Sequence, residues 1–243
     1  MRGLALLLIL AATPAAAQEL TLSLGEGSSL TARTVELFAL VTVLSLVPGL
    51  AIMFTCFPFI VTVLAILRQG LGLQQSPPNM LIVSLALFLT YFVMEPVFTQ
   101  SWTQGVQPLI DGKLDLTAAF SAGIEPVRAF MGHRIDPATF DALRALRPDA
   151  AAPAGSGAEA LRSAPLSLMI PSFLLSEIQR AFEIGFLIYL PFLIIDLVVA
   201  AVLMSMGMMM VPPAMVSLPF KLAFFVVVNG WALVSGALVR SYF

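Results

Sequence analysis

Five ionisable residues lie inside the two apolar stretches at residues 166–204 and 214–239. They are Glu177, Arg180, Glu183, Asp196 and Lys221. A charge at the centre of a bilayer costs at least about 2.5–3.5 kcal/mol on insertion scales, so several charges in one apolar hairpin need partners or water. We therefore interpret the five residues as a polar seam that faces a neighbouring subunit or a conduit. A stretch of helix at the membrane surface or in solvent is the alternative.

Within this seam, Glu177, Arg180 and Glu183 are spaced three residues apart. Side chains three apart on a helix share one face, so opposite charges at this spacing can pair. The spacing predicts an acid–base–acid ladder with Arg180 in the middle.

A second unusual feature is a run of three methionines, Met208, Met209 and Met210, between Gly207 and the pair Pro212-Pro213. Methionine is unbranched, flexible and polarisable, so it adapts to irregular surroundings. Two interpretations follow from the chemistry alone. The thioethers either fill gaps in a core, or they form a ring that closes around an object of variable shape.

Nothing in the sequence supports catalysis or metal binding. The single histidine, His133, lies beside Arg134 in a polar region, which favours a solvated or capping role. The single cysteine, Cys56, lies in an apolar run and is expected to be a small buried hydrophobe. No metalloprotease, nucleophile-elbow or phosphate-loop motif is present. The sequence predicts a protein that is not an enzyme, with no catalytic residue, metal or cofactor.

The composition indicates a membrane protein. Hydrophobic residues make up 59% of the 243 residues and charged residues 11%, whereas an average soluble domain carries about 25% charged residues. The mean hydropathy is +0.98. Lipid or partner subunits must cover the apolar excess. The net charge of −2, without a basic cluster, gives no electrostatic basis for nucleic-acid binding.

The first seventeen residues are expected to be a cleaved signal peptide. Arg2 gives a short positive region, an apolar stretch follows, and Ala15-Ala16-Ala17 forms a small-residue cleavage site before Gln18. An uncleaved anchor is the alternative. Cleavage would place the mature N-terminus on the outer side of the inner membrane.

The remaining chain divides into three regions. Residues 18–98 hold a first helical hairpin, with apolar stretches at 35–67 and 80–98. The longer stretch contains Pro48 and Pro58, so it is read as two helical pieces or one bent helix. Residues 99–165 form a polar, partly helical loop, in which Asp136 caps a short helix over 138–146.

Residues 166–243 form the C-terminal hairpin, with apolar stretches at 166–204 and 214–239 joined by the methionine-rich turn. The predicted fold is all-α, with membrane-associated helical hairpins built from Pro-kinked helices. Counted from a cleaved N-terminus, the turns at 68–79 and 205–213 face the cytoplasm. The loop 99–165 then lies on the periplasmic side.

Several motifs resemble a known family. The strongest is FLIYLPFLIIDLVVAAVLMSMGMMMVPPAMVSLPFKL, residues 186–222. Others are LRQGLGLQQSPPNM at 67–80, PSFLLSEIQRAFEIGF at 171–186 and NGW at 229–231. Together they resemble the FliP family of type III secretion export-gate proteins, from about residue 35 to the end of the chain. The match is weakest over residues 99–165.

The resemblance implies an all-helical subunit of the bacterial inner membrane that assembles with copies of itself, about five in number, into a helical, channel-like oligomer. FliQ and FliR homologues would join it, with FlhA and FlhB homologues nearby. Unfolded flagellar proteins would pass through the central pore of this gate in the flagellar basal body. By the family pattern, Met208, Met209 and Met210 would form a methionine gasket at the constriction.

This chain departs from the family pattern at two charged positions. Phe59 stands where relatives usually carry a basic residue, and Asn229 stands where they usually carry Asp. Because an orphaned buried charge is costly, we interpret the two departures as the joint loss of one buried ion pair. This interpretation predicts that positions 59 and 229 lie close together.

Three rival functions remain open from the sequence. The injectisome paralogue of the same family would export virulence effectors. A small ion-coupled transporter or channel would use the polar seam as its coupling site and would be favoured by inverted repeats, which are not evident. A purely structural membrane anchor would leave the methionine turn without a purpose.

Overall fold

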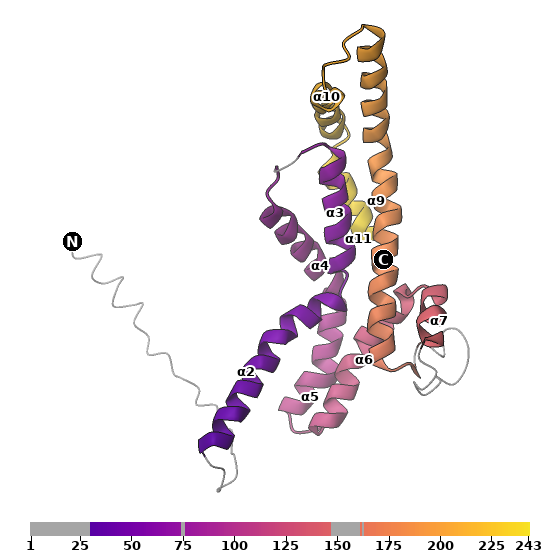
Figure 1. The fold of residues 1–243 in the computed structure, drawn as a ribbon. Helices are drawn as coiled ribbons and strands as arrows, with labels where there is room; N and C mark the ends of the chain where they lie inside the picture. The colour runs from indigo at the N-terminus through magenta and orange to yellow at the C-terminus, as the bar shows by residue number, and fades with distance from the viewer. Residues whose placement is uncertain (1–29, 74–75, 147–160, 162) are drawn as a thin grey trace, which may run out of the picture. The chain divides into compact units, whose positions relative to one another are not determined.

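The computed structural model describes residues 30–73, 76–146, 161 and 163–243, and this part of the chain contains helices and no strand (Figure 1). The predicted all-α class is therefore confirmed. The predicted signal peptide, residues 1–17, lies outside the described residues. The chain divides into two compact units, residues 1–46 and 47–243, and the second holds the functional candidates.

The apolar stretch predicted at 35–67 forms two helices. α2 spans Leu30–Met53 and α3 spans Phe57–Gly70. Pro48 lies inside α2 and does not end it; the break between the two helices comes several residues later, after Met53. Pro58 stands in the first turn of α3, where its missing N–H has no intrahelical partner to lose.

The second apolar stretch continues well beyond its predicted end. α4 spans Asn79–Ser101 and passes through Pro96. A π-helical segment, η1, follows at Trp102–Val106, and α5 spans Gln107–Ile110. Arg68 closes the preceding turn, because its guanidinium donates hydrogen bonds to the Asn79 side chain and to the Pro77 carbonyl.

The predicted polar loop is largely helical. α6 spans Leu116–Arg134 and α7 spans Pro137–Ala145. The predicted cap of the short helix is confirmed, since the Asp136 carboxylate accepts hydrogen bonds from the Thr139 N–H at 2.8 Å and from its hydroxyl at 2.9 Å. These bonds lower the pKa of Asp136. The nineteen-residue α6 was not predicted.

The C-terminal region contains one long helix and one broken helix. α9 spans Leu166–Ser205, forty residues, with Pro171 and Pro191 inside it. The stretch predicted at 214–239 consists of α10, Pro213–Val227, and α11, Gly230–Arg240, which are bent by 61°. The bend lies at Asn229, whose φ of 51° is left-handed.

Two hydrophobic clusters hold the second unit together. The larger one centres on buried side chains of α3 and includes residues of α4, α9, α10 and α11. The smaller one joins α6 and α7 to the start of α9. In Figure 1, α3 runs beside the middle of α9, while α6 and α7 lie near its beginning. α9 is therefore the element that α3, α6, α7 and α10 all contact.

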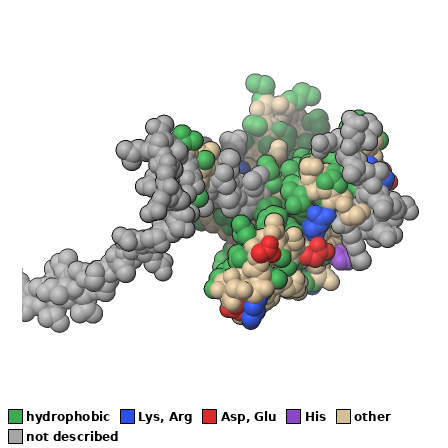
Figure 2. Space-filling view, turned by 90° about the horizontal axis from the view of Figure 1, so that it is seen from below, with side chains coloured by type: hydrophobic (Ala, Val, Ile, Leu, Met, Phe, Trp, Pro, Cys, Tyr) green, Lys and Arg blue, Asp and Glu red, His purple; other side chains and the backbone are tan. Residues whose placement is uncertain are grey.

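The second unit contains candidates for membrane-spanning helices and a region of exposed charges at one end. Two helical stretches are long and apolar enough to cross a bilayer, Asn79–Ile110 and Leu166–Ser205, and the bent pair α10–α11 is a third candidate. Figure 2 looks toward the end where α5 and α6 lie and shows acidic, basic and histidine side chains among hydrophobic ones. Exposed Asp111, Lys113 and Asp115 belong to this region.

The crossing of η1 and α6 depends on two glycines. A Cβ atom added at Gly105 would lie 2.6 Å from the Gly123 Cα and 2.8 Å from the Ala119 carbonyl oxygen. A Cβ at Gly123 would instead meet its nearest atoms at 3.5 Å, which is ordinary contact. Only the first position lacks room for a side chain.

We predict that Gly105→Ala destabilises the protein by about 1–3 kcal/mol, because backbone atoms must move to relieve the overlap. Gly123→Ala at the same crossing is the matched control and should be neutral or slightly stabilising, since alanine is the better helix former. Thermal unfolding of the purified protein in mild detergent compares the two. Equal melting temperatures would contradict the close crossing.

Candidate functional site

The methionine-rich turn begins where α9 ends at a glycine. Gly207 has a left-handed φ of 75°. Its N–H donates to the Met204 carbonyl at 3.0 Å, and the N–H of Met208 donates to the Leu203 carbonyl at 3.0 Å. This pair of bonds is the Schellman pattern, which satisfies carbonyls at a helix C-terminus and needs a residue that tolerates positive φ. Pro212 and Pro213 then start α10.

The three methionines of this turn are exposed. The exposed fraction is 38% for Met208, 84% for Met209 and 96% for Met210. The interpretation that they fill gaps in the core of this chain is therefore wrong. Flexible thioethers on a turn between two apolar helices form a soft apolar surface that can contact another molecule.

The pair of helices that carries the turn is joined by an ion pair between a buried lysine and a half-buried aspartate. Lys221 of α10 is 4% exposed, and its Nζ lies 2.6 Å from Oδ2 of Asp196 on α9. The hydroxyl of Ser217 donates to the other carboxylate oxygen of Asp196 at 2.6 Å. Both oxygens of the carboxylate are thus satisfied, which is the condition for tolerating a charge in apolar surroundings.

Lys221 also joins this helix pair to α3. Its Nζ donates to the Gly70 carbonyl at 3.1 Å, at the last residue of α3. The final carbonyls of a helix lack intrahelical donors and carry partial negative charge, so an ammonium group is favourable there. One lysine therefore links α3, α9 and α10. We refer to Asp196, Ser217 and Lys221 as the α9–α10 clamp.

A second buried ion pair lies nearer the start of α9. The side chain of Glu177 is fully buried, and its Oε1 accepts a hydrogen bond from Nε of Arg134 at 2.7 Å. The hydroxyl of Tyr242 donates to the other carboxylate oxygen. Nη1 of Arg134 donates to the Ser241 carbonyl at 2.9 Å. Arg134 at the end of α6 thus binds both α9 and the segment after α11.

Aromatic rings enclose this second cluster. The guanidinium carbon of Arg134 lies 4.0 Å from the Tyr242 ring centroid and 5.6 Å from that of Phe59. Phe130 stacks on Tyr242 with centroids 5.9 Å apart. Burial raises the pKa of the Tyr242 phenol, so the phenol stays protonated and donates to Glu177. We refer to Arg134, Glu177 and Tyr242 as the α6–α9 clamp.

Comparison with known proteins identifies the family. The profile of the FliP family matches residues 40–238. The flagellar biosynthetic protein FliP of Caulobacter vibrioides is 50% identical over 238 residues, which cover 96% of this chain and 86% of the relative. The protein of the same name from Bacillus subtilis is 45% identical over 212 residues, 86% of this chain and 92% of the relative. The chain belongs to the FliP family.

A third relative, from Agrobacterium fabrum, carries the same name and is 46% identical over 214 residues, 88% of this chain and 86% of the relative. The family match, over residues 40–238, covers the α9–α10 clamp, the methionine turn, and Arg134 and Glu177 of the α6–α9 clamp; Tyr242 lies just beyond it.

The five residues of the predicted polar seam do not form one continuous seam in this FliP-family chain. Asp196 and Lys221 form the α9–α10 clamp, and Glu177 belongs to the α6–α9 clamp. Arg180 approaches Glu177 only to 3.9 Å and is partly exposed. Glu183 accepts a hydrogen bond from Gln179 at 3.1 Å. The predicted ladder is present in part: Arg180 and Glu177 form an ion pair, the described residues show none between Arg180 and Glu183, and Arg134 is the nearer partner of Glu177.

The predicted closeness of positions 59 and 229 is wrong within one chain. Phe59 packs edge-on against Tyr242, which follows α11, with centroids 5.6 Å apart. Asn229 caps the opposite end of the same helix. Eleven helical residues at 1.5 Å each separate these ends by about 16 Å. The cation beside Phe59 comes from Arg134 instead.

The clamps include residues that sequence reasoning did not single out. Arg134 and Tyr242 lie 43 and 65 residues from Glu177 along the chain, and Ser217 lies 21 from Asp196. No local spacing rule connects such partners.

Cys56 is fully buried as predicted, and burial raises the pKa of its thiol to about 12.

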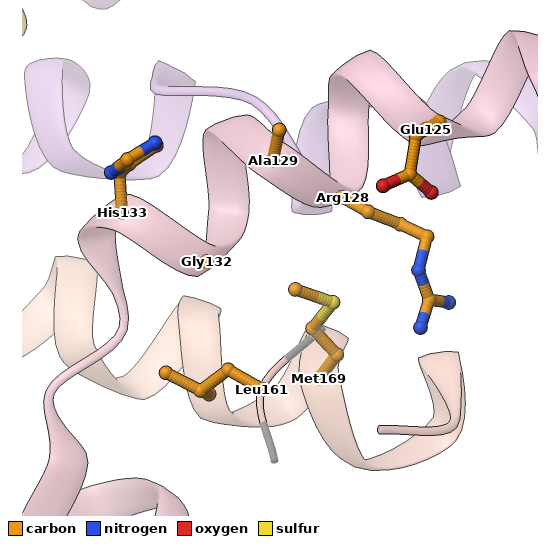
Figure 3. A pocket seen from close by; sticks show the side chains of 7 residues that line it. All are labelled: Glu125, Arg128, Ala129, Gly132, His133, Leu161 and Met169. Carbon is orange, nitrogen blue, oxygen red and sulfur yellow. The ribbon is translucent and has the colours of Figure 1, made fainter. Parts of the chain in front are cut away.

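A cavity of about 320 Å³ lies between α6 and the start of α9. Figure 3 shows Glu125, Arg128 and His133 on the α6 side and Met169 on the α9 side. His133 is exposed, in agreement with its predicted solvated role, and Arg128 donates to the Ala164 carbonyl at 2.6 Å. The described residues contain no cluster of three or more histidine, cysteine, aspartate or glutamate side chains suited to a metal ion.

We predict that Arg134→Met destabilises the protein by about 3–5 kcal/mol, because it leaves the buried Glu177 carboxylate without its cation. Arg180→Met is the matched control and should cost less than about 1 kcal/mol, since its contact is long and partly solvated. Denaturant unfolding in mild detergent measures both changes.

The double variant Arg134→Met with Glu177→Met should recover part of the loss, since it removes both charges together. If Arg180→Met proved as costly as Arg134→Met, the assignment of Arg134 as the main partner of Glu177 would be refuted.

Proposed function

We propose that this chain is a core subunit of the flagellar protein export gate, a structural component and not an enzyme. Together with FliQ and FliR homologues it would form the channel through which unfolded flagellar proteins leave the cytoplasm. Membership of the FliP family supports this assignment. The relatives from Caulobacter vibrioides and Bacillus subtilis are both named as flagellar biosynthetic proteins, which favours the flagellar branch over the injectisome branch.

The observation that carries the proposal is the exposed methionine turn. Met208, Met209 and Met210 stand at the end of two helices that the α9–α10 clamp joins. When about five copies surround an axis, these turns would form the methionine gasket. Soft thioethers can close against ions and deform around side chains of different size.

The charged residues support a structural role over ion-coupled transport. A coupling site needs ionisable groups that line an aqueous path and change partners. Asp196 and Lys221 instead satisfy each other and Ser217, and Glu177 is enclosed by Arg134 and Tyr242. We assign these groups to holding the subunit in shape.

The two spanning candidates support a membrane location for the subunit. We propose the inner membrane at the flagellar basal body, with residues 99–165 on the periplasmic side and residues 1–17 removed as a signal peptide. FlhA and FlhB homologues would be neighbours in the export apparatus, and membrane lipid would cover the remaining apolar surface.

Native mass spectrometry of the protein, expressed alone and purified in mild detergent, tests the assembly. We expect a discrete ring of about five copies, because the apolar faces and the methionine turns of one copy need neighbours. Each copy should lack the mass of residues 1–17. A monomer or dimer that retains Met1 would contradict both proposals.

Deletion of Met208, Met209 and Met210 tests the gasket. We expect the ring to assemble, because the clamps are untouched, while cells become leaky to small ions, as measured with a membrane-potential dye. Met215→Ala is the matched control, since Met215 is 73% exposed on α10 but lies outside the turn. Unchanged permeability in the deletion variant would refute the gasket.

A further inference from the structure

Half of the methionines of this chain lie in one short segment. Six of the twelve stand within residues 204–215, and all six are exposed: Met204, Met206, Met208, Met209, Met210 and Met215. No charged residue lies between Asp196 and Lys221, and the side chains of residues 206–211 offer thioether sulfur as their sole ligand atom. Figure 1 shows the turn extending beyond α3 and α11 at the end of α9. The turn therefore presents a concentrated set of soft, neutral sulfur donors.

Two reverse turns bring these methionines close together. The N–H of Met209 donates to the Gly207 carbonyl at 3.0 Å, and the N–H of Val211 donates to the Met208 carbonyl at 3.4 Å. Bonds that span three and four residues wind the backbone into a compact loop. Neighbouring methionines therefore start from Cα atoms only about 3.8 Å apart.

This spacing suits the sulfur ligands of a single metal ion. When each metal–sulfur bond is about 2.3 Å, two ligand sulfurs of one ion lie about 4 Å apart. Methionine has three rotatable bonds, so its sulfur can adjust to such a position at little cost. Thioethers of adjacent and nearly adjacent residues can thus converge on one ion without a change of the backbone.

Three side chains project most fully from the turn. The exposed fraction is 65% for Met206, 84% for Met209 and 96% for Met210. Met208 is less exposed, and its N–H is bonded to the Leu203 carbonyl, which keeps it beside the end of α9. The first three sulfurs are therefore the ones available to a ligand from outside.

We propose that Met206, Met209 and Met210 bind a soft monovalent cation of the Cu(I) class through their sulfurs. Thioethers are soft ligands that select Cu(I), whereas Mg²⁺ and Ca²⁺ prefer oxygen. The described residues contain no histidine, cysteine or carboxylate cluster that could hold a harder ion. A site of this kind departs from the prediction that the protein binds no metal. It lies within one chain, so it does not depend on the proposed ring.

The single cysteine does not account for binding of a soft cation. Cys56 is fully buried, and burial raises the pKa of its thiol to about 12, so the thiolate that binds metals does not form near neutral pH. Met53 and Met80 are exposed methionines outside the turn, and each stands without a second methionine beside it in the sequence. They provide a matched control for the clustered residues.

Competition with bicinchoninate for Cu(I), under anaerobic and reducing conditions, tests the site in the full-length protein in mild detergent. Cys56→Ala is the reference, so that no thiol takes part. We expect about one Cu(I) per chain. Replacing Met206, Met209 and Met210 together by leucine should weaken binding about tenfold or more, because leucine keeps the volume and removes the sulfur. Met53→Leu with Met80→Leu should bind as the reference does.

X-ray absorption at the copper edge is the second measurement, and we expect sulfur neighbours around the ion. Equal affinity of the triple variant and the reference would overturn the inference, as would nitrogen or oxygen neighbours in place of sulfur. A ring that assembles but does not bind Cu(I) would overturn the inference and leave the proposed function standing. Cu(I) bound by the turn of a protein that forms no ring would support the inference and contradict the proposed assembly.

Discussion

The burial of the Glu177 carboxylate is the constraint around which the second unit is organised. A fully buried carboxylate is tolerated only when both oxygens have partners. One oxygen is bound by Arg134 at the end of α6, and the other by Tyr242 after the end of α11. Because these partners come from distant parts of the chain, satisfying one charge brings the polar region, the long helix and the C-terminus together.

The α9–α10 clamp repeats this principle further along the same helix. Asp196 lies about 28 Å from Glu177 at 1.5 Å per helical residue. Its partner Lys221 also binds the end of α3, so α3 is held at both ends, by Phe59 near one clamp and by Gly70 at the other. The methionine turn follows the second clamp, and its place in the subunit is therefore set by two ion pairs and not by contacts of its own.

Local chemistry made some of this structure predictable. The ends of α9 agree with the predicted stretch 166–204 to within a residue. The N-cap at Asp136 is also confirmed, because a short acidic side chain directly before a proline favours the N-cap position of a helix. The bend at Asn229 was not predicted, because a single left-handed residue inside an apolar run leaves the hydropathy unchanged. α6 was not predicted because its moderate polarity and internal Pro126 resemble those of a loop.

The partners of Glu177 were beyond prediction for a different reason. Arg180 has the correct helical spacing, and that spacing is a valid argument for an exposed helix. Burial changes the result, since a buried carboxylate gains more from a cation that is itself enclosed and bonded on several sides. Arg134 meets that condition through Ser241, Phe59 and Tyr242. The folded chain removes Glu177 from water, and this burial decides which cation pairs with it. Local residue spacing does not reveal such burial.

The surface of α9 shows why the ion pairs inside the subunit matter for its surroundings. Only 11% of the most apolar window of this helix is buried within the chain. Lipid and neighbouring subunits can both cover such a surface, but only a subunit can also match charges and a soft methionine turn at defined positions. The two clamps neutralise Glu177, Asp196 and Lys221, so apart from Arg180 and Glu183 the outer faces of α9 and α10 are apolar and can contact a neighbour without burying an unpaired charge. The residues that keep the subunit rigid therefore also leave its outer faces free for assembly.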